Sequence, residues 1–201
     1  MNDQYLYEYA DIFERVLSVA YECRYSTPAL ERLISYSSFF QSIEKDKNGF
    51  APIINGAALI KEFFPSLKKD LSETPIYNQC LWAGESFLRI QGETGLTFEC
   101  IFLYISIRKM YDYFPMYHEM DFSQIINEFK RLFAAKSALF LLLERQHRSL
   151  AGIAKQIDVS YDVLLSLKTR RRDIKKANVA AVVKLAKALN VRVETVAEIS
   201  L

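Results

Sequence analysis

The sequence predicts an all-α fold made of two helical domains. Hydrophobic residues make up 51% and charged residues 25% of the 201 residues, which is the composition of an ordinary globular protein. The chain has only 6 glycines and 5 prolines, too few for a turn-rich β fold. Apolar residues also recur at the three- and four-residue spacing of helices along most of the chain.

The first two predicted helices cover residues 3–23 and about 28–45. Asp3 is a candidate N-cap of the first helix, whose apolar positions follow helical spacing up to Ala20. Thr27–Pro28 is typical of an N-cap followed by proline at the first helical position, which opens the second helix.

Two further helices are expected after a polar turn. Asn55–Gly56 opens a short helix that runs to Phe64, where Pro65 stops it. Thr74–Pro75 repeats the combination of cap and proline, and it predicts a helix that ends near Arg89.

Residues 97–114 are rich in Phe, Ile and Tyr, a composition that fits either a buried strand or a buried helix. The length of the run and its helical surroundings favour a central helix, which Pro115 ends. Asp121 is then the expected cap of a helix that begins at Phe122.

The helical pattern that begins at Phe122 continues almost unbroken to Arg145. Two interpretations stay open. Either one long helix joins the two domains, or the helix breaks near residues 134–137 and Ser137 caps a new one.

Charge is distributed unevenly along the chain. Residues 137–201 hold 12 of the 26 basic and 6 of the 24 acidic residues, a balance of +6, which leaves 14 basic and 18 acidic residues, a balance of −4, for the rest. A basic C-terminal module on an acidic body suits binding to a polyanion. Chance segregation of surface charge is the alternative.

The last third of the chain contains a helix, a tight turn and a second helix, followed by a basic loop. Residues 150–157 and 161–168 form the two predicted helices, and Ser149 and Ser160 occupy their N-cap positions. This order is that of a helix-turn-helix, which places its second helix in a DNA groove.

From about residue 137 to residue 199 the chain resembles the Cro/lambda-repressor-like helix-turn-helix family, often called the XRE family. Ile153–Ala154 match the Leu–Ala pair of the family's second helix, and residues 182–191 closely match the stretch that ends its fourth helix. The resemblance implies a C-terminal domain of four or five short helices that binds operator DNA, usually as a dimer.

Three residues depart from the family pattern. Asp158 replaces the glycine of the turn, Arg170 replaces the glycine after the third helix, and Leu150 replaces a polar residue that helps to hold a phosphate. Asp tolerates a left-handed backbone better than most residues, so we expect the turn to form at some cost in stability.

The resemblance places Tyr161, Asp162, Leu165 and Ser166 toward the DNA groove. Base edges are usually read by Arg, Asn and Gln, and residues 161–168 contain none of these. We therefore expect binding that is dominated by the DNA backbone, with modest discrimination between bases.

The basic loop is the stronger signal. Arg170–Arg172 and Lys175–Lys176 supply five cations, which fit a clamp on phosphates, although a merely solvated loop is the alternative. The residues predicted to bind DNA are Ser149, Ser160, Tyr161, Asp162, Leu165, Ser166, Lys168, Thr169, Arg170, Arg171, Arg172, Lys175 and Lys176.

No enzyme, metal or cofactor is expected. His118 lies near Glu119 and Asp121 in a candidate acid–base cluster, but no nucleophile or orienting partner accompanies it. The 3 cysteines lack the spacing of metal ligands.

A cytoplasmic protein without a membrane partner is expected. The N-terminus lacks the basic and apolar regions of a signal peptide. The most apolar stretch, residues 96–110, contains charged residues and is too short to span a bilayer.

Three hypotheses on function remain open. The favoured one is a transcriptional regulator in which residues 1–136 dimerise, sense a small molecule or hold a peptide or protein partner, while residues 137–201 bind double-stranded DNA as part of a homodimer. The second is a protein-binding module, such as the antitoxin half of a toxin–antitoxin pair, whose aromatic N-terminal surface binds a partner. The third is a helix-turn-helix that serves only for protein contact.

Overall fold

The computed structural model describes residues 3–45, 56–64, 77–171 and 178–198. These described residues form helices and no strand, which confirms the predicted all-α class. The helices are α1 (Asp3–Glu22), α2 (Thr27–Tyr36), α3 (Ser38–Lys45), α4 (Gly56–Phe63), α5 (Tyr77–Thr94), α6 (Phe98–Tyr104), α7 (Ile107–Tyr117), α8 (Phe122–Ala135), α9 (Ala138–Arg145), α10 (Leu150–Ile157), α11 (Tyr161–Lys168), α12 (Val179–Leu189) and α13 (Val193–Ala197).

The predicted helix over residues 28–45 is two helices, so that boundary was wrong. Ser37 has extended backbone torsions (φ −66°, ψ 132°) and separates α2 from α3. The cap of α2 is also one residue earlier than predicted, because Ser26 takes the N-cap position and Thr27–Pro28 lie in the first turn. Thr74–Pro75 lies outside the described residues, and α5 continues past Arg89 to Thr94.

Residues 97–114 are helical, as favoured over a strand, but they form two helices instead of one. Ile105 is extended, and Ser106 caps α7 by accepting a hydrogen bond from the amide of Lys109. Pro115 does not end this helix but lies inside it. A proline leaves the carbonyl four residues before it without a backbone donor, and here the carbonyl of Tyr111 accepts from the Gln79 side chain at 3.1 Å.

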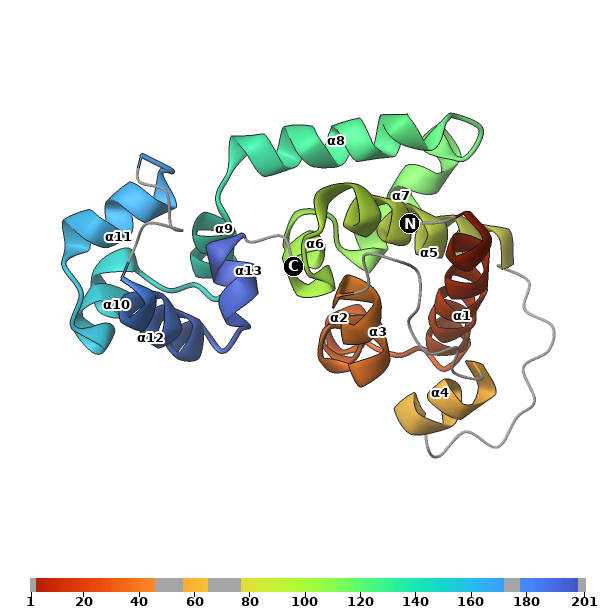
Figure 1. Ribbon diagram of the computed structural model, residues 1–201, viewed down its shortest axis with the longest axis horizontal. Coiled ribbons are helices and arrows are strands. Elements are labelled where there is room, and N and C mark those ends of the chain that lie inside the picture. The colour runs from red at the N-terminus through yellow and green to blue at the C-terminus, as the bar shows by residue number, and fades with distance from the viewer. Residues whose placement is uncertain (1–2, 46–55, 65–76, 172–177, 199–201) are drawn as a thin grey trace.

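The chain breaks between α8 and α9, which decides between the two interpretations of residues 122–145. Lys136 is extended (φ −138°, ψ 149°), so α8 ends at Ala135. Ser137 then caps α9, and its side chain accepts from the amide of Phe140. The two helices consequently run in different directions (Figure 1).

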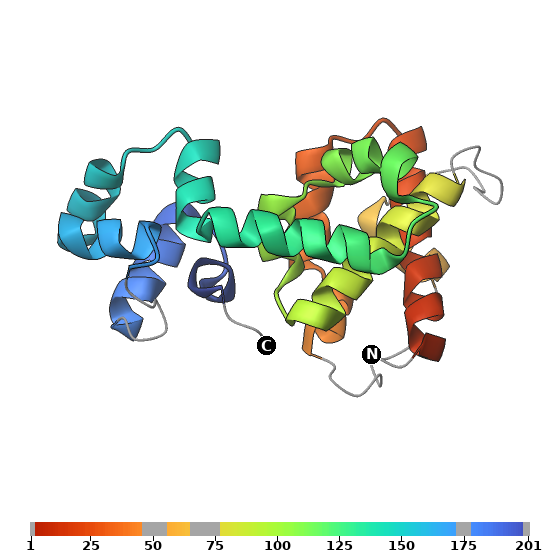
Figure 2. The same cartoon turned by 90° about the horizontal axis from the view of Figure 1, so that it is seen from above.

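Helices α1–α7 gather at one end of the molecule, and α8 runs from them to α9; together they are here called the body. Helices α9–α13 form the other end, here called the bundle (Figures 1 and 2). In both views α10 and α11 lie far from α1 and α5. The division of the chain into two domains at residues 136 and 137 stays a prediction.

Aromatic side chains fill the centre of the body. The ring of Phe13 lies 4.7 Å from that of Phe40, 5.8 Å from that of Phe87 and 5.6 Å from that of Phe98, measured between centroids. A Cβ atom at Gly84 would lie only 3.1 Å from that of Phe13, so glycine permits the close packing of α5 on α1. Aromatic rings at these distances stabilise the folded protein by more than the burial of their apolar area alone.

The body and the bundle meet at a buried ion pair. Arg192, between α12 and α13, donates to Glu44 of α3 at 2.6 Å, and the two side chains are 11% and 0% exposed. The amide of Phe98 donates to the other oxygen of Glu44 at 2.6 Å. Burial raises the pKa of Glu44, while the Arg192 guanidinium opposes that rise.

A second carboxylate reinforces this contact. Glu99 of α6 accepts at one oxygen from the Arg192 amide (2.9 Å) and from the Thr195 hydroxyl (2.6 Å). The Thr195 hydroxyl also lies 3.2 Å from that of Thr97. Charge-assisted bonds of this kind fix geometry more firmly than neutral ones.

The variant Arg192→Met is expected to lower the free energy of unfolding by about 3–5 kcal/mol, because it leaves a buried carboxylate without its cation. Urea denaturation followed by circular dichroism measures the loss. The double variant Glu44→Gln, Arg192→Met buries no charge and should recover a large part of it. A double variant no more stable than Arg192→Met would show that the uncompensated charge is not the cause.

Candidate nucleic-acid interface

Helices α10 and α11 follow one another with a tight turn between them. Asp158 adopts the left-handed conformation expected for it (φ 55°, ψ 55°). The amide of Val159 donates to the carbonyl of Ala154 at 3.1 Å and closes the end of α10. The chain therefore turns from α10 into α11 within only three residues, 158–160.

Apolar residues of the bundle are buried together in one small core, and Val159 of the turn is half-buried beside them. They come from α10, α11 and α12, and they leave the opposite side of each helix free for polar residues. The buried members are Ile153, Ala154, Ile157, Leu164, Leu167, Val182, Leu185, Ala186 and Leu189.

The caps predicted for α10 and α11 are in place, with one difference, and α12 is capped as well. The side chain of Ser149 accepts from the amide of Gly152 at 3.0 Å, and that of Asn178 accepts from Ala180 at 2.8 Å. Ser160 occupies the N-cap position of α11 but makes no side-chain capping bond. Its exposed hydroxyl is therefore not used within the helix.

The four residues of α11 assigned to the DNA groove differ in exposure. Tyr161 and Asp162 are exposed, whereas Leu165 and Ser166 are half-buried. The Ser166 hydroxyl donates to the carbonyl of Val163 at 2.7 Å, which ties it to its own helix. Tyr161 and Asp162 are accordingly the most prominent of these side chains.

The end of α11 carries a cation and a hydroxyl. The Lys168 ammonium lies 4.9 Å from the centroid of the Phe140 ring, and that of Lys136 lies 4.7 Å from the same ring. Cation–π attraction of this kind holds Lys136 and the last residue of α11, Lys168, at the same ring of α9. Thr169 is exposed, and its hydroxyl donates to the carbonyl of Leu165 at 2.8 Å. Sequence reasoning missed Lys136 and Phe140, since nothing in their spacing marks them.

Arg170 makes contacts within the protein. Its guanidinium donates to both carboxylate oxygens of Glu198, at 2.6 and 3.2 Å, and to the carbonyl of Phe133. The same group lies over the Phe133 ring, 4.6 Å from its centroid. Arg170 also has a left-handed backbone (φ 54°), at the position where the family resembled has glycine. These contacts offset the cost of placing arginine there.

Glu198 is the centre of this network. Its Oε1 also accepts from the Tyr104 hydroxyl at 2.6 Å and from the Ala138 amide at 2.6 Å. Burial, followed by the adjacent Glu198 carboxylate, raises the pKa of Tyr104. The Tyr104 hydroxyl therefore stays protonated and donates, which links α6 to the bundle.

Of the remaining basic residues in the predicted clamp, Arg171 is exposed. Arg172, Lys175 and Lys176 lie outside the described residues. The structure thus separates Arg170, which is engaged internally, from Arg171, which faces solvent.

Comparison with known proteins found no matching family model, no matching curated protein and no matching solved structure. Within the described ranges, no helix is long and apolar enough to cross a membrane. The same part of the chain holds no group of His, Cys, Asp and Glu side chains arranged to bind a metal ion.

The variant Asp158→Gly is expected to raise the free energy of unfolding by about 0.5–1 kcal/mol, because glycine adopts the left-handed conformation without a Cβ penalty. Asp158→Ala should lower it by a similar amount, since alanine has neither that freedom nor a polar side chain. Urea denaturation of both variants checks the pair. An alanine variant at least as stable as the glycine variant would contradict the assigned conformation.

Proposed function

We propose that this protein is a DNA-binding transcriptional regulator of the Cro/lambda-repressor type. The observation that supports the proposal most directly is the α10–turn–α11 unit. Its apolar side is buried in the bundle, while Tyr161 and Asp162 are exposed. In both views the unit lies at the end of the molecule remote from α1 and α5, so the body does not cover it (Figures 1 and 2).

Phosphate contacts supply most of the proposed affinity. Ser149 caps α10, and the N-terminus of such a helix suits a phosphate oxygen. Lys168, Thr169 and Arg171 follow at the end of α11, and Arg172, Lys175 and Lys176 belong to the same clamp. Arg170 is not included, because its guanidinium is bound to Glu198.

Base recognition is proposed to be modest. The outer side of α11 offers a phenol at Tyr161, a carboxylate at Asp162 and, half-buried, the side chains of Leu165 and Ser166. None of these forms the bidentate bonds by which Arg, Asn or Gln read a base. A homodimer that binds two DNA half-sites compensates for the weak base discrimination of each copy.

A protein-binding role is the second candidate, and one observation favours it. Tyr7 and Tyr21 on α1 are 64% and 53% exposed, and Tyr25, just after α1, is 39% exposed. Exposed tyrosines are enriched at protein interfaces. This surface belongs to the body, so a partner bound there leaves α11 free for DNA.

The principal test is fluorescence anisotropy of the protein on a random-sequence DNA duplex over a series of salt concentrations. Affinity should fall steeply with salt. Arg171→Ala should reduce the magnitude of the slope of log affinity against log salt concentration by about 0.9, the value of one phosphate contact. No binding at low salt by the folded protein would overturn the proposal.

Two variants serve as controls in this titration. Arg15→Ala removes the same charge from the exposed side of α1 and should leave the slope unchanged. Arg170→Ala breaks the network of Glu198, so it should lower the melting temperature, an effect not expected of Arg171→Ala.

The variant Asp162→Asn is expected to raise affinity for the random duplex about threefold to tenfold at low salt, because it removes a carboxylate that repels phosphates. The same anisotropy titration measures the change. Asp112→Asn, an exposed carboxylate of α7, provides the matched control. An unchanged or lower affinity for Asp162→Asn would place α11 away from the DNA.

A further inference from the structure

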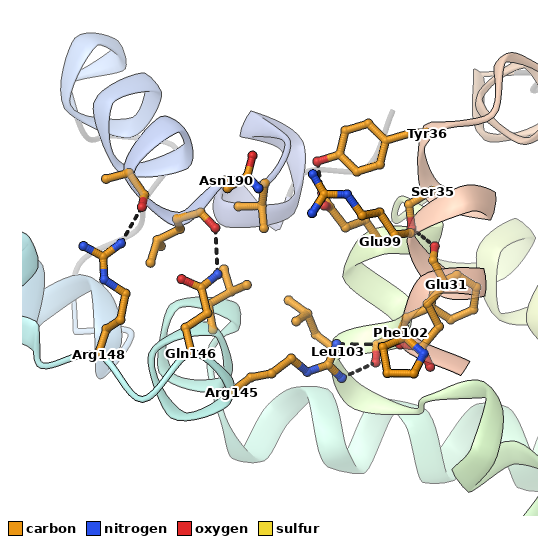
Figure 3. A pocket seen from close by; sticks show the side chains of 16 residues that line it. Glu31, Ser35, Tyr36, Glu99, Phe102, Leu103, Arg145, Gln146, Arg148 and Asn190 are labelled. Carbon is orange, nitrogen blue, oxygen red and sulfur yellow. Dashed lines mark hydrogen bonds and ion pairs between the residues drawn. The ribbon is translucent and has the colours of Figure 1, made fainter. Parts of the chain in front are cut away.

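A hollow of about 450 Å³ lies between the body and the bundle. Its walls come from α2 and α6 on one side and from α9 and the connection between α12 and α13 on the other (Figure 3). Its size falls within the range of small-molecule sites, roughly 300–1,000 Å³.

Part of the lining of the hollow is apolar. Phe102 and Leu103 of α6, Leu142 of α9 and Leu189 of α12 are buried side chains that reach it, and Val191 is half-buried beside them. Figure 3 shows Leu103 near the centre of the view, between the two walls. Such a surface suits the hydrocarbon or aromatic part of a ligand.

Two carboxylates line the hollow, and both are already satisfied. Glu99 accepts from the Tyr36 hydroxyl at 3.0 Å in addition to its two bonds from the bundle. Burial and the Glu99 carboxylate raise the pKa of Tyr36 to about 12, so the phenol donates. Glu31 accepts from the Ile107 amide at 2.9 Å, with Arg145 at 3.8 Å.

The arginines are less fully neutralised. Arg148 donates to the carbonyl of Ala188 and to the Gln156 amide oxygen, both uncharged groups. Arg32 is exposed and packs against the Tyr36 ring, 5.7 Å from its centroid. Among the described residues, no carboxylate lies within ion-pair distance of either guanidinium. The charge left available in the hollow is therefore positive.

From this arrangement we infer that the hollow is a binding site for a small organic anion with an apolar or aromatic body. The anionic group pairs with Arg32 at the rim, since guanidinium groups match planar oxyanions. The apolar body lies against Leu103, Leu142 and Val191.

A ligand in this position contacts the body and the bundle at once. Arg32 and Leu103 belong to the body, whereas Leu142, Arg148 and Val191 belong to the bundle. A ligand that binds only when both walls are in place stabilises the native arrangement by mass action. Binding should therefore raise the melting temperature as well as give a direct signal.

The probe for the test is 1-anilinonaphthalene-8-sulfonate, an aromatic anion whose fluorescence rises in apolar sites. We expect saturable binding at one site per chain and a rise in melting temperature. Arg32→Gln should weaken this binding about threefold to tenfold, the loss of one exposed charge-assisted bond. The neutral probe N-phenyl-1-naphthylamine should bind that variant and the unaltered protein equally.

Two further variants complete the experiment. Leu103→Trp fills the hollow and should abolish binding of both probes, with near-ultraviolet circular dichroism to verify the fold. Arg15→Gln removes an arginine from α1, away from the hollow, and should change nothing. Because Arg32 is exposed, its variant is expected to fold and stays decisive if Leu103→Trp does not fold. Equal binding of the anion to Arg32→Gln and to the unaltered protein, or retained binding by a folded Leu103→Trp, would overturn the inference.

Discussion

The buried pair of Arg192 and Glu44 is the constraint on which the arrangement of this protein depends. A carboxylate with a fully buried side chain, such as that of Glu44, requires a cation and hydrogen-bond donors. Arg192 of the bundle supplies the cation, and the amide of Phe98 in α6 donates a hydrogen bond. The body alone would contain an uncompensated charge at α3. The folded state of the body and the docking of the bundle are thus physically linked through one side chain.

This linkage changes the meaning of the uneven charge along the chain. The basic excess of residues 137–201 suggested a surface for polyanions, yet Arg145, Arg170 and Arg192 are directed at carboxylates or carbonyls of the protein itself. Two of the acidic residues of the body, Glu31 and Glu44, likewise pair with arginines of the bundle. The cationic surface left for a partner is smaller than the sequence count implies.

Local signals in the sequence predicted most helix starts, because caps act within a few residues. Asp121, Ser137 and Ser149 each accept an amide of their own helix, as expected. The breaks at Ser37 and Ile105 were missed, since a single extended residue in an apolar run leaves the helical spacing nearly intact. For the candidate site, the turn and the core of α10–α12 were predictable, whereas the partners of Arg170 come from distant segments.

The chain passes between body and bundle at the join of α8 and α9, and it returns to the body through the contacts of Arg192 and Thr195 with α3 and α6. These two attachments restrict rotation of the bundle relative to the body more than a single flexible linker would. In the DNA-binding dimer proposed above, if it forms through the body, the distance between the two copies of α11 is then a property of the fold. Such a dimer tolerates little variation in operator length, and a few inserted base pairs would turn one half-site out of reach.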